Sequence, residues 1–194
     1  MQAAGFVLVG GRSSRMGRDK ALLRWESHSL LEDVAARVRD AAGNVALLGP
    51  PERYEMFTLE CLPDLHPNFG PLAGIETALA SARGELNLIV ACDMPGVEPH
   101  WLQMLLESAE RNGALCTVLR DPSGTTHPLC AVYRSACLPV IQRRLNAAQL
   151  RVQDAVCELR AAIVDAAAEL ANLNTQDDWH AWRTAQTPRV SHAD

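Results

Sequence analysis

Short apolar runs alternate along this chain with longer segments in which apolar residues recur at helical spacing. Five of the short runs are bounded by Gly, Pro, Asp or Arg, a pattern that predicts strands. These runs cover residues 5–9, 45–48, 86–91, 114–119 and 129–133. Continuous rather than alternating apolarity in the first and third runs favours strands that are buried on both faces, as in a parallel sheet.

Two of the segments between these runs predict helices. In residues 30–38 and again in residues 101–109, apolar residues recur at i, i+1, i+4, i+5 and i+8, which places them on one helical face. Strand and helix alternate, so we expect a three-layer α/β/α domain around a mostly parallel, Rossmann-like sheet with right-handed crossovers. Ligands of such sheets bind beyond the C-terminal ends of the strands, where we therefore look for site residues.

Length and composition narrow the class of protein. The 194 residues suit one domain, which we expect to cover residues 1–186, followed by a polar, disordered tail over residues 187–194. A net charge of −5 and an aromatic content of 5% give no reason to expect binding to nucleic acid or to a membrane. The N-terminus does not resemble a signal peptide, and the six cysteines show no C-x-x-C pair, so we expect a cytoplasmic protein with reduced thiols.

A glycine-rich, basic loop follows the first predicted strand. Gly10 and Gly11 allow positive φ angles and close approach to a ligand, and successive backbone N–H groups can form an anion-binding concavity. Residues 12–20 carry four cations and one anion, against the overall sign of the chain. The loop matches neither the P-loop nor the G-x-G-x-x-G pattern. We interpret it as a polyphosphate site; the alternative is a solvated basic loop that binds nothing.

The strand predicted over residues 86–91 runs into Cys92-Asp93-Met94-Pro95. A carboxylate at the end of a buried strand faces the ligand crevice, and Mg²⁺ favours one or two carboxylates together with phosphate oxygens. Asp93 is therefore the predicted ligand of Mg²⁺, the expected cofactor. The alternative is an aspartate that only caps the turn.

The loop sequence Leu8-Val9-Gly10-Gly11, followed by Arg15-Met16-Gly17 and Asp19-Lys20, resembles the signature of the MobA-like nucleotidyltransferases, the family of molybdenum cofactor guanylyltransferase. The resemblance extends over residues 5–182 and implies a fold of the nucleotide-diphospho-sugar transferase type. It implies nucleotide contacts through the backbone of Leu8, Val9, Gly10 and Gly11. Lys20 would bind the phosphates, Arg15 would stabilise the departing pyrophosphate, and Asp93 would hold the metal.

A second segment resembles the family's other nucleotide loop, which lies against the guanine and ribose. It comprises Gly70, Pro71 and Leu72, and Asp64 matches a family aspartate on the nucleotide side, although a plain loop aspartate is as well supported. The family also has a nucleotide-contacting asparagine after its second strand. Residues 45–51 contain none, so that contact is lost or made by backbone groups.

Three residues are candidate contacts to the acceptor. His127 precedes the last predicted strand, near where the family handles the acceptor, although a surface-loop histidine is the favoured interpretation. Asn172 and Asn174 lie in a segment that resembles the family's Asn-x-Asn-Thr-Pro element, with Gln176 in place of proline. Thr175 and Asp178 equally predict a capping box for a following helix.

The resemblance implies transfer of GMP from GTP to molybdopterin, with release of pyrophosphate, and transient contacts with other proteins of the molybdenum cofactor pathway. A cytidylyltransferase for the same pterin and a sugar-phosphate nucleotidyltransferase are alternatives of the same fold. Cytidylyl relatives tend to carry Ala-Gly in place of Gly10-Gly11, which favours GTP. A non-catalytic nucleotide-binding regulator is an alternative of a different class.

Overall fold

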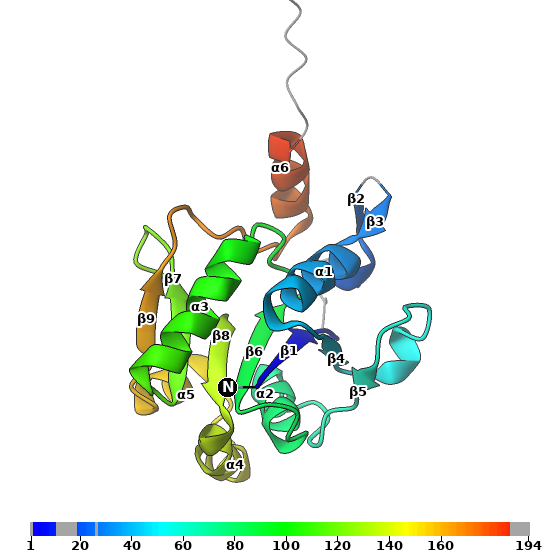
Figure 1. The fold of residues 1–194 in the computed structure, drawn as a ribbon. Coiled ribbons are helices and arrows are strands. Elements are labelled where there is room, and N and C mark those ends of the chain that lie inside the picture. The colour runs from blue at the N-terminus through cyan, green and yellow to red at the C-terminus, as the bar shows by residue number, and fades with distance from the viewer. Residues whose placement is uncertain (1, 11–18, 26, 187–194) are drawn as a thin grey trace, which may run out of the picture.

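The structure is a computed structural model that describes residues 2–10, 19–25 and 27–186. Its centre is a seven-stranded sheet (Figure 1). From one edge to the other, the strands are β5 (Cys61–Leu62), β4 (Ala46–Leu48), β1 (Ala3–Leu8), β6 (Leu86–Ala91), β8 (Thr126–Arg134), β7 (Cys116–Arg120) and β9 (Ala162–Asp165). The first four run parallel, and β8 is antiparallel to both β6 and β7. A separate hairpin pairs β2 (Arg24–Trp25) with β3 (His28–Ser29).

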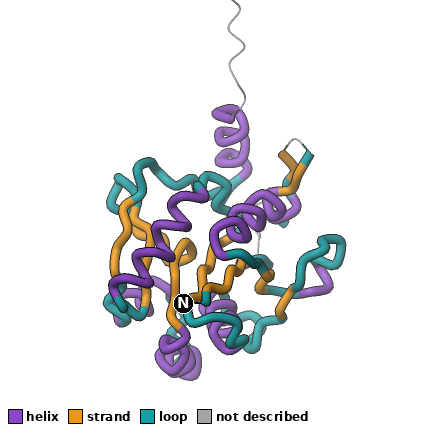
Figure 2. The backbone as a smooth tube through the Cα atoms, in the orientation of Figure 1, coloured by secondary structure: helices purple, strands orange, loops and turns teal. Residues whose placement is uncertain are grey.

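Helices cover both faces of the sheet, as Figure 2 shows. On one face lie α1 (Leu30–Ala42) and α3 (Pro99–Asn112), and on the other lie α2 (Pro71–Ala80), α4 (Leu138–Asn146) and α5 (Val152–Glu158). Each face has its own cluster of buried apolar side chains. Short 3₁₀ turns cover Lys20–Leu22, Pro51–Arg53 and Ser135–Cys137. The predicted three-layer fold is confirmed.

All five predicted strands are present, and β6 has the predicted bounds. The short strands β5 and β9 and the helices α4 and α5 were not predicted. The sheet buries both faces of β6 because helices pack against each of them, which agrees with its continuous apolar sequence. The predicted tail over residues 187–194 lies outside the described residues.

A last helix, α6 (Gln176–Gln186), stands beyond the C-terminal ends of the parallel strands, beside the β2–β3 hairpin (Figure 1). A small third cluster of side chains joins the two. Trp182 packs edge-on against Trp25 of the hairpin and stacks on Trp179, which is itself buried beside Leu30 and Leu173. This cluster fixes the segment that leads into α6.

The start of α1 is defined by a capping box. The Ser29 hydroxyl accepts a hydrogen bond from the Glu32 backbone N–H, and the Glu32 carboxylate accepts one from the Ser29 backbone N–H. The helix ends at Gly43, which has a φ of 77° that favours glycine. Both ends of α1 are therefore encoded locally.

We expect Ser29→Ala to lower the free energy of unfolding by about 1 kcal/mol, because it leaves a helix N–H without its acceptor. Chemical denaturation measures the loss. Glu32→Gln keeps an oxygen acceptor on the other side of the box and should cost less. An equal or larger loss in Glu32→Gln would contradict this account of the cap.

Candidate active site

The parallel strands β5, β4, β1 and β6 all end on the same side of the sheet, which we call its C-terminal edge. The predicted loops follow these strand ends. Hydrogen bonds continue past the strands: Val9 N donates to Leu48 O at 2.9 Å, and Cys92 N donates to Leu8 O at 3.1 Å. Gly49 N donates to Leu62 O at 3.0 Å. Leu62 ends β5 and lies two residues before Asp64. Residues far apart in sequence therefore meet at this edge.

Gly10 makes the turn after β1. Its φ is 86°, and a Cβ at this position would lie 2.6 Å from Pro50 Cδ. Both the backbone angle and the space therefore require glycine here. Gly11 and Arg15 lie outside the described residues, so their roles stay predictions.

The end of β4 is where the resemblance places the family's nucleotide-contacting asparagine. The Gly49 N–H is already bonded to Leu62 O, and neither Pro50 nor Pro51 has an N–H. These three residues therefore offer no free backbone N–H in place of the asparagine, and the two alternatives from the sequence both stay open.

Lys20 and Asp93 meet at the centre of this edge. Lys20 lies in the 3₁₀ turn after the glycine loop, and its Nζ is 3.4 Å from Asp93 Oδ2, just beyond β6. The same ammonium is 3.3 Å from Asn174 Oδ1, in the turn before α6. Three segments separated by more than 70 residues each thus converge on one cation, which is also the only lysine of the sequence.

Solvent reaches this ion pair only in part, since the side chains of Lys20 and Asp93 are 15% and 23% exposed. Burial raises the pKa of Asp93, and the neighbouring Lys20 ammonium opposes that shift. Burial and the nearby carboxylates of Asp93 and Asp19 raise the pKa of Cys92, which keeps that thiol protonated. This pair therefore presents one cation and one carboxylate at this edge.

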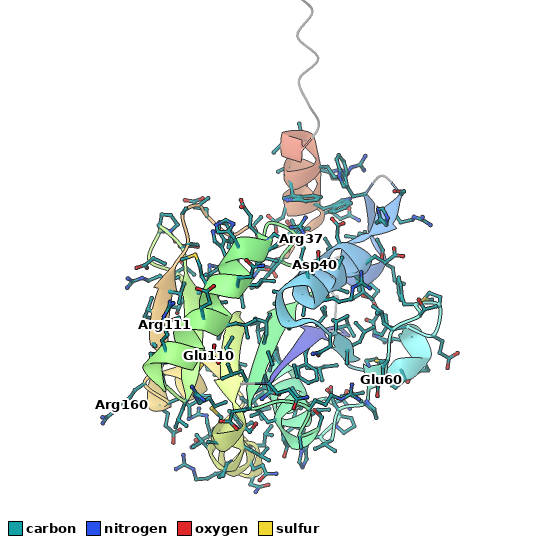
Figure 3. All side chains as sticks on the ribbon, viewed as in Figure 1. Arg37, Asp40, Glu60, Glu110, Arg111 and Arg160 are labelled. Carbon is teal, nitrogen blue, oxygen red and sulfur yellow. The ribbon has the colours of Figure 1, made fainter. Side chains whose placement is uncertain are left out.

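Arg37 holds the turn that presents Asp93. From α1 (labelled in Figure 3), its Nη1 donates to Pro95 O at 2.5 Å and to Val97 O at 2.7 Å. Asp33, one helical turn earlier, lies 3.6 Å from the same guanidinium. Sequence analysis missed this residue, because an arginine on an amphipathic helix has no feature that distinguishes it from a solvated one.

The second predicted nucleotide loop opens α2. Gly70 is its N-cap with a φ of 72°, and Pro71 occupies the first turn. Leu72 is buried in the core, whereas Gly70 and Pro71 are exposed at the edge. The exposed backbone of this helix start can therefore face a nucleotide.

Asp64 is half-buried beside this loop, and burial raises its pKa. A Cβ on Gly74 of α2 would lie 2.8 Å from Leu8 Cδ1 and 3.7 Å from Asp64 Oδ1. The missing side chain of Gly74 thus lets the end of β1 and the Asp64 carboxylate approach α2 closely. The structure brings Asp64 to the same edge as Leu8.

Two side chains of α2 contact the loop that precedes this helix and fix its position. The buried Glu76 carboxylate lies 2.6 Å from His66 Nδ1, and the Thr77 hydroxyl accepts a hydrogen bond from Leu65 N at 3.0 Å. His66 also packs against Phe69, with ring centroids 5.8 Å apart. No motif of the sequence marks His66 or Glu76.

The surface-loop interpretation of His127 was wrong. His127 lies inside β8, is 6% exposed, and places Nε2 2.9 Å from Asp121 Oδ2. It is buried because β8 begins at Thr126, earlier than predicted, and pairs with β7. Asp121 also accepts hydrogen bonds from Ser123 and Thr125, so this pair closes the β7–β8 hairpin. Contact of His127 with an acceptor stays a prediction.

The capping-box interpretation of the C-terminal element is confirmed, and contact of Asn172 or Asn174 with an acceptor stays a prediction. The predicted capping box is present: Asp178 N donates to Thr175 Oγ1, and Asp178 Oδ2 accepts from the backbone N–H groups of Asn174 and Thr175. The Asn174 side chain, meanwhile, contacts Lys20. Leu173 N donates to Asp93 O at 2.9 Å, which fixes this turn against the metal-site candidate. Asn172 is exposed in the same turn.

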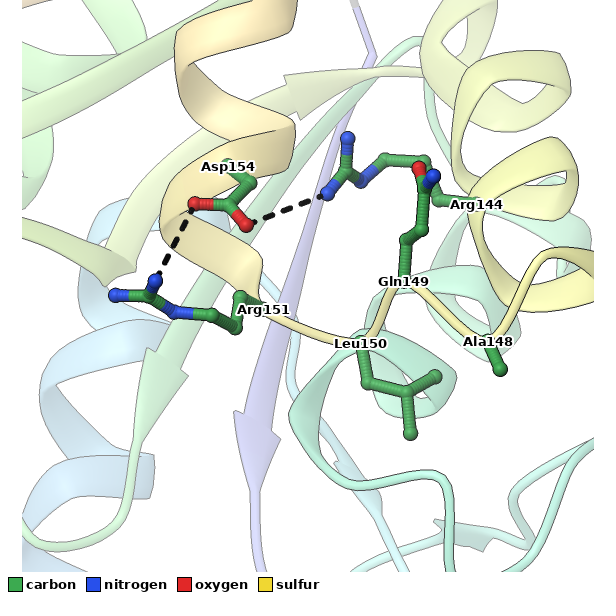
Figure 4. A pocket seen from close by; sticks show the side chains of 6 residues that line it. All are labelled: Arg144, Ala148, Gln149, Leu150, Arg151 and Asp154. Carbon is green, nitrogen blue, oxygen red and sulfur yellow. Dashed lines mark ion pairs between the residues drawn. The ribbon is translucent and has the colours of Figure 1, made fainter.

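A cavity of about 460 Å³ lies between the end of α4 and the start of α5 (Figure 4). Asp154 bridges two arginines in its wall, Arg144 at 3.8 Å and Arg151 at 4.0 Å. The residues that line the cavity include none of the site residues predicted from the sequence.

Two further features of the described residues bear on the predicted classes. No helix there has the length and apolarity to cross a membrane. All six cysteines are free thiols, and Cys116, Cys130 and Cys137 are buried among apolar side chains.

Comparison with known proteins identifies the fold and the family. The family model described as MobA-like NTP transferase domain matches residues 5–163. The protein named molybdenum cofactor guanylyltransferase from Xanthomonas euvesicatoria is 33% identical over 183 residues, covering 90% of this chain and 91% of that protein. A relative from Pelotomaculum thermopropionicum, named probable molybdenum cofactor guanylyltransferase, is 34% identical over 92% of this chain and 90% of its own length.

Solved structures show the same fold at lower identity. Molybdopterin-guanine dinucleotide biosynthesis protein A from Archaeoglobus fulgidus superposes with a TM-score of 0.77 at 24% identity, covering 94% of this chain and 97% of that one. CMP:2-keto-3-deoxy-manno-octonic acid synthetase, solved with CTP, gives 0.75 at 14% identity, covering 95% and 98%. The architecture is that of the nucleotidyltransferases. This chain belongs to the MobA-like NTP transferase family.

The Asp121–His127 pair gives a pH prediction. Hydrogen bonds from Ser123 and then from His127 lower the pKa of Asp121 from its ordinary value of 3.8 to about 2. A carboxylate with a lowered pKa stabilises the fold above its unfolded-state pKa, and this contribution is lost as the pH falls through the folded-state value. We expect Asp121→Asn to be less stable than the parent protein at pH 6, with a difference that shrinks between about pH 4 and pH 2. Urea denaturation at each pH measures it; a difference independent of pH would contradict the assignment.

Proposed function

We propose that this chain transfers GMP from GTP to molybdenum-molybdopterin, forming molybdopterin guanine dinucleotide and releasing pyrophosphate. The observation that carries the proposal is the meeting of Lys20, Asp93 and Asn174 at the edge where Gly10 and the start of α2 also lie. The family membership and the names of the most similar relatives support the same reaction.

The chemistry requires charge neutralisation and positioning rather than a general base. The attacking group is a phosphate oxygen that is already anionic, and its in-line attack on the α-phosphate brings two polyanions together. The Lys20 ammonium would stabilise negative charge on the phosphates, and Arg15 would assist at the pyrophosphate. Removing one such preorganised donor costs roughly 3–4 kcal/mol.

A magnesium ion fits the donors at this edge. Mg²⁺ binds hard oxygens and commonly takes one or two carboxylates together with substrate phosphates and water. Asp93 supplies one partly exposed carboxylate, and the described residues contain no group of three acidic, His or Cys side chains that would form a complete protein site. Asp93 would hold the ion, which when bound supplies further positive charge to the phosphates.

Cytoplasmic location stays a prediction.

Two observations bear on the alternatives. An alanine at position 10, as in the cytidylyl relatives, would meet Pro50 and adopt a strained φ, so this turn is built for glycine. The Lys20–Asp93 pair is intact, as a catalytic nucleotidyltransferase needs, whereas a regulator that only binds nucleotide does not need a metal-binding carboxylate. Both favour the guanylyltransferase over its alternatives.

We expect Lys20→Ala and Asp93→Ala each to lower turnover at least a hundredfold, because each removes a charge that faces the phosphates. The assay is molybdopterin-dependent release of pyrophosphate from α-labelled GTP. Asp165→Ala is a matched control, since Asp165 also ends a strand and pairs with an arginine (Arg120, 2.7 Å) but lies on the exposed edge strand β9. Circular dichroism checks that a loss of turnover does not come from unfolding. Near-normal turnover in either site variant would refute the assigned role.

We expect GTP with Mg²⁺ to raise the melting temperature more than CTP with Mg²⁺ at equal concentration. A nucleotide at 100 times its dissociation constant adds about 2.7 kcal/mol of stability, which a thermal-shift assay detects. A larger shift with CTP would favour the cytidylyltransferase, and equal shifts would remove the argument for GTP.

A further inference from the structure

We infer that Tyr54 is a positioning residue for Lys20 and acts through Asp19. This inference rests on the proposed function of Lys20 as the phosphate-binding cation. Tyr54 lies in the connection between β4 and β5, after the Pro51–Arg53 turn, and neither its position nor its contact with Asp19 is marked by a motif. Its hydroxyl donates to Asp19 Oδ2 at 2.8 Å.

Asp19 fixes the backbone on which Lys20 stands. Its other carboxylate oxygen, Oδ1, accepts a hydrogen bond from Ala21 N at 3.1 Å, and its carbonyl accepts from Leu22 N at 3.2 Å. Asp19 is therefore the N-cap of the 3₁₀ turn Lys20–Leu22. Lys20 is held between this cap and Ala21, which is fully buried.

The Tyr54 hydroxyl anchors this cap to the core. Tyr54 is 1% exposed and belongs to the same buried cluster as Ala21. Burial and the hydrogen bond to Asp19 raise the pKa of Tyr54, so the hydroxyl keeps its proton and stays a donor. The contact is a hydrogen bond from a rigid, buried donor to a carboxylate, a class stronger than bonds between neutral groups.

The same contact keeps Asp19 from competing for the lysine. Asp19 and Lys20 are adjacent, and a carboxylate with an unoccupied oxygen would attract the neighbouring ammonium. In the structure, both Asp19 oxygens have donors of their own, and Lys20 Nζ lies instead against Asp93 and Asn174. Tyr54 therefore directs the cation towards the edge of the sheet where a triphosphate would bind.

The chain offers a matched control for the hydroxyl. Tyr133 on β8 is also fully buried, and its hydroxyl donates one hydrogen bond, to Pro128 O at 2.8 Å. It pairs with Asn87 near the start of β6, at the opposite end of that strand from Asp93. Tyr54→Phe and Tyr133→Phe thus each remove one buried hydroxyl, and only the first contacts the Lys20 turn.

The single lysine allows a readout that does not depend on activity. Reductive methylation with ¹³C-formaldehyde labels Lys20 and the N-terminal amine, and NMR then reports the environment of each. In the ligand-free protein, we expect Tyr54→Phe to shift the dimethyl-Lys20 signal and Tyr133→Phe to leave it unchanged. We expect Asp19→Ala to shift it at least as far, and Tyr54→Phe combined with Asp19→Ala to shift it no further than Asp19→Ala alone.

Kinetics give the second readout. We expect Tyr54→Phe to raise the KM for GTP at least fivefold and to change kcat less, whereas Tyr133→Phe changes neither.

An unchanged Lys20 signal in Tyr54→Phe, equal effects of the two tyrosine variants, or additive effects of Tyr54→Phe and Asp19→Ala would overturn the inference. If the parent protein does not turn over GTP while the NMR shifts follow the expected pattern, the proposed function fails and the positioning of Lys20 by Tyr54 stands. If Tyr54→Phe does not fold, the Asp19→Ala signal decides: no shift there overturns the inference.

Discussion

The ion pair between Lys20 and Asp93 is the contact on which the site depends. Lys20 lies in the segment after β1 and Asp93 in the segment after β6, which is the neighbouring parallel strand. Each residue depends on this sheet edge for its function, because the edge brings the two together. Three further residues support one or the other of them. Arg37 holds the turn of Asp93, Asp19 caps the turn of Lys20, and Leu173 bonds the backbone of Asp93.

The pair also explains the placement of the C-terminal segment. Asn174 reaches Lys20 because α6 begins with a capping box and is anchored by tryptophans against the β2–β3 hairpin. That small cluster is separate from the two large core clusters. The site therefore has one wall made by a part of the chain that adds little to the main core. The tryptophan cluster and the contacts of Leu173 and Asn174 set the position of this wall.

The sequence predicted the sheet and the ends of its central strands, because buried parallel strands are continuous apolar runs and ligands bind beyond them. It predicted Lys20 and Asp93 through a long motif and through the position of a carboxylate after a strand. It did not predict Arg37 or the contact between Tyr54 and Asp19 as supports, since these depend on partners 35 to 60 residues away in sequence. One available signal was overlooked: a chain with 18 basic residues contains one lysine, at the end of the glycine-rich loop.

His127 shows the limit of local patterns most clearly. A histidine before a proline favours a loop, but pairing with β7 extends β8 over both residues and buries the ring against Asp121. Long-range strand pairing overrode the local preference there. The same holds for β5, a two-residue strand that is defined by its pairing with β4.

The most direct test of the account is a crystal structure with a non-hydrolysable GTP analogue and Mg²⁺. The account predicts that Lys20 Nζ lies within hydrogen-bond distance of phosphate oxygens and that an Asp93 oxygen binds the metal beside them. A nucleotide bound elsewhere, or a triphosphate at this edge with Lys20 still held only by Asp93 and Asn174, would contradict it.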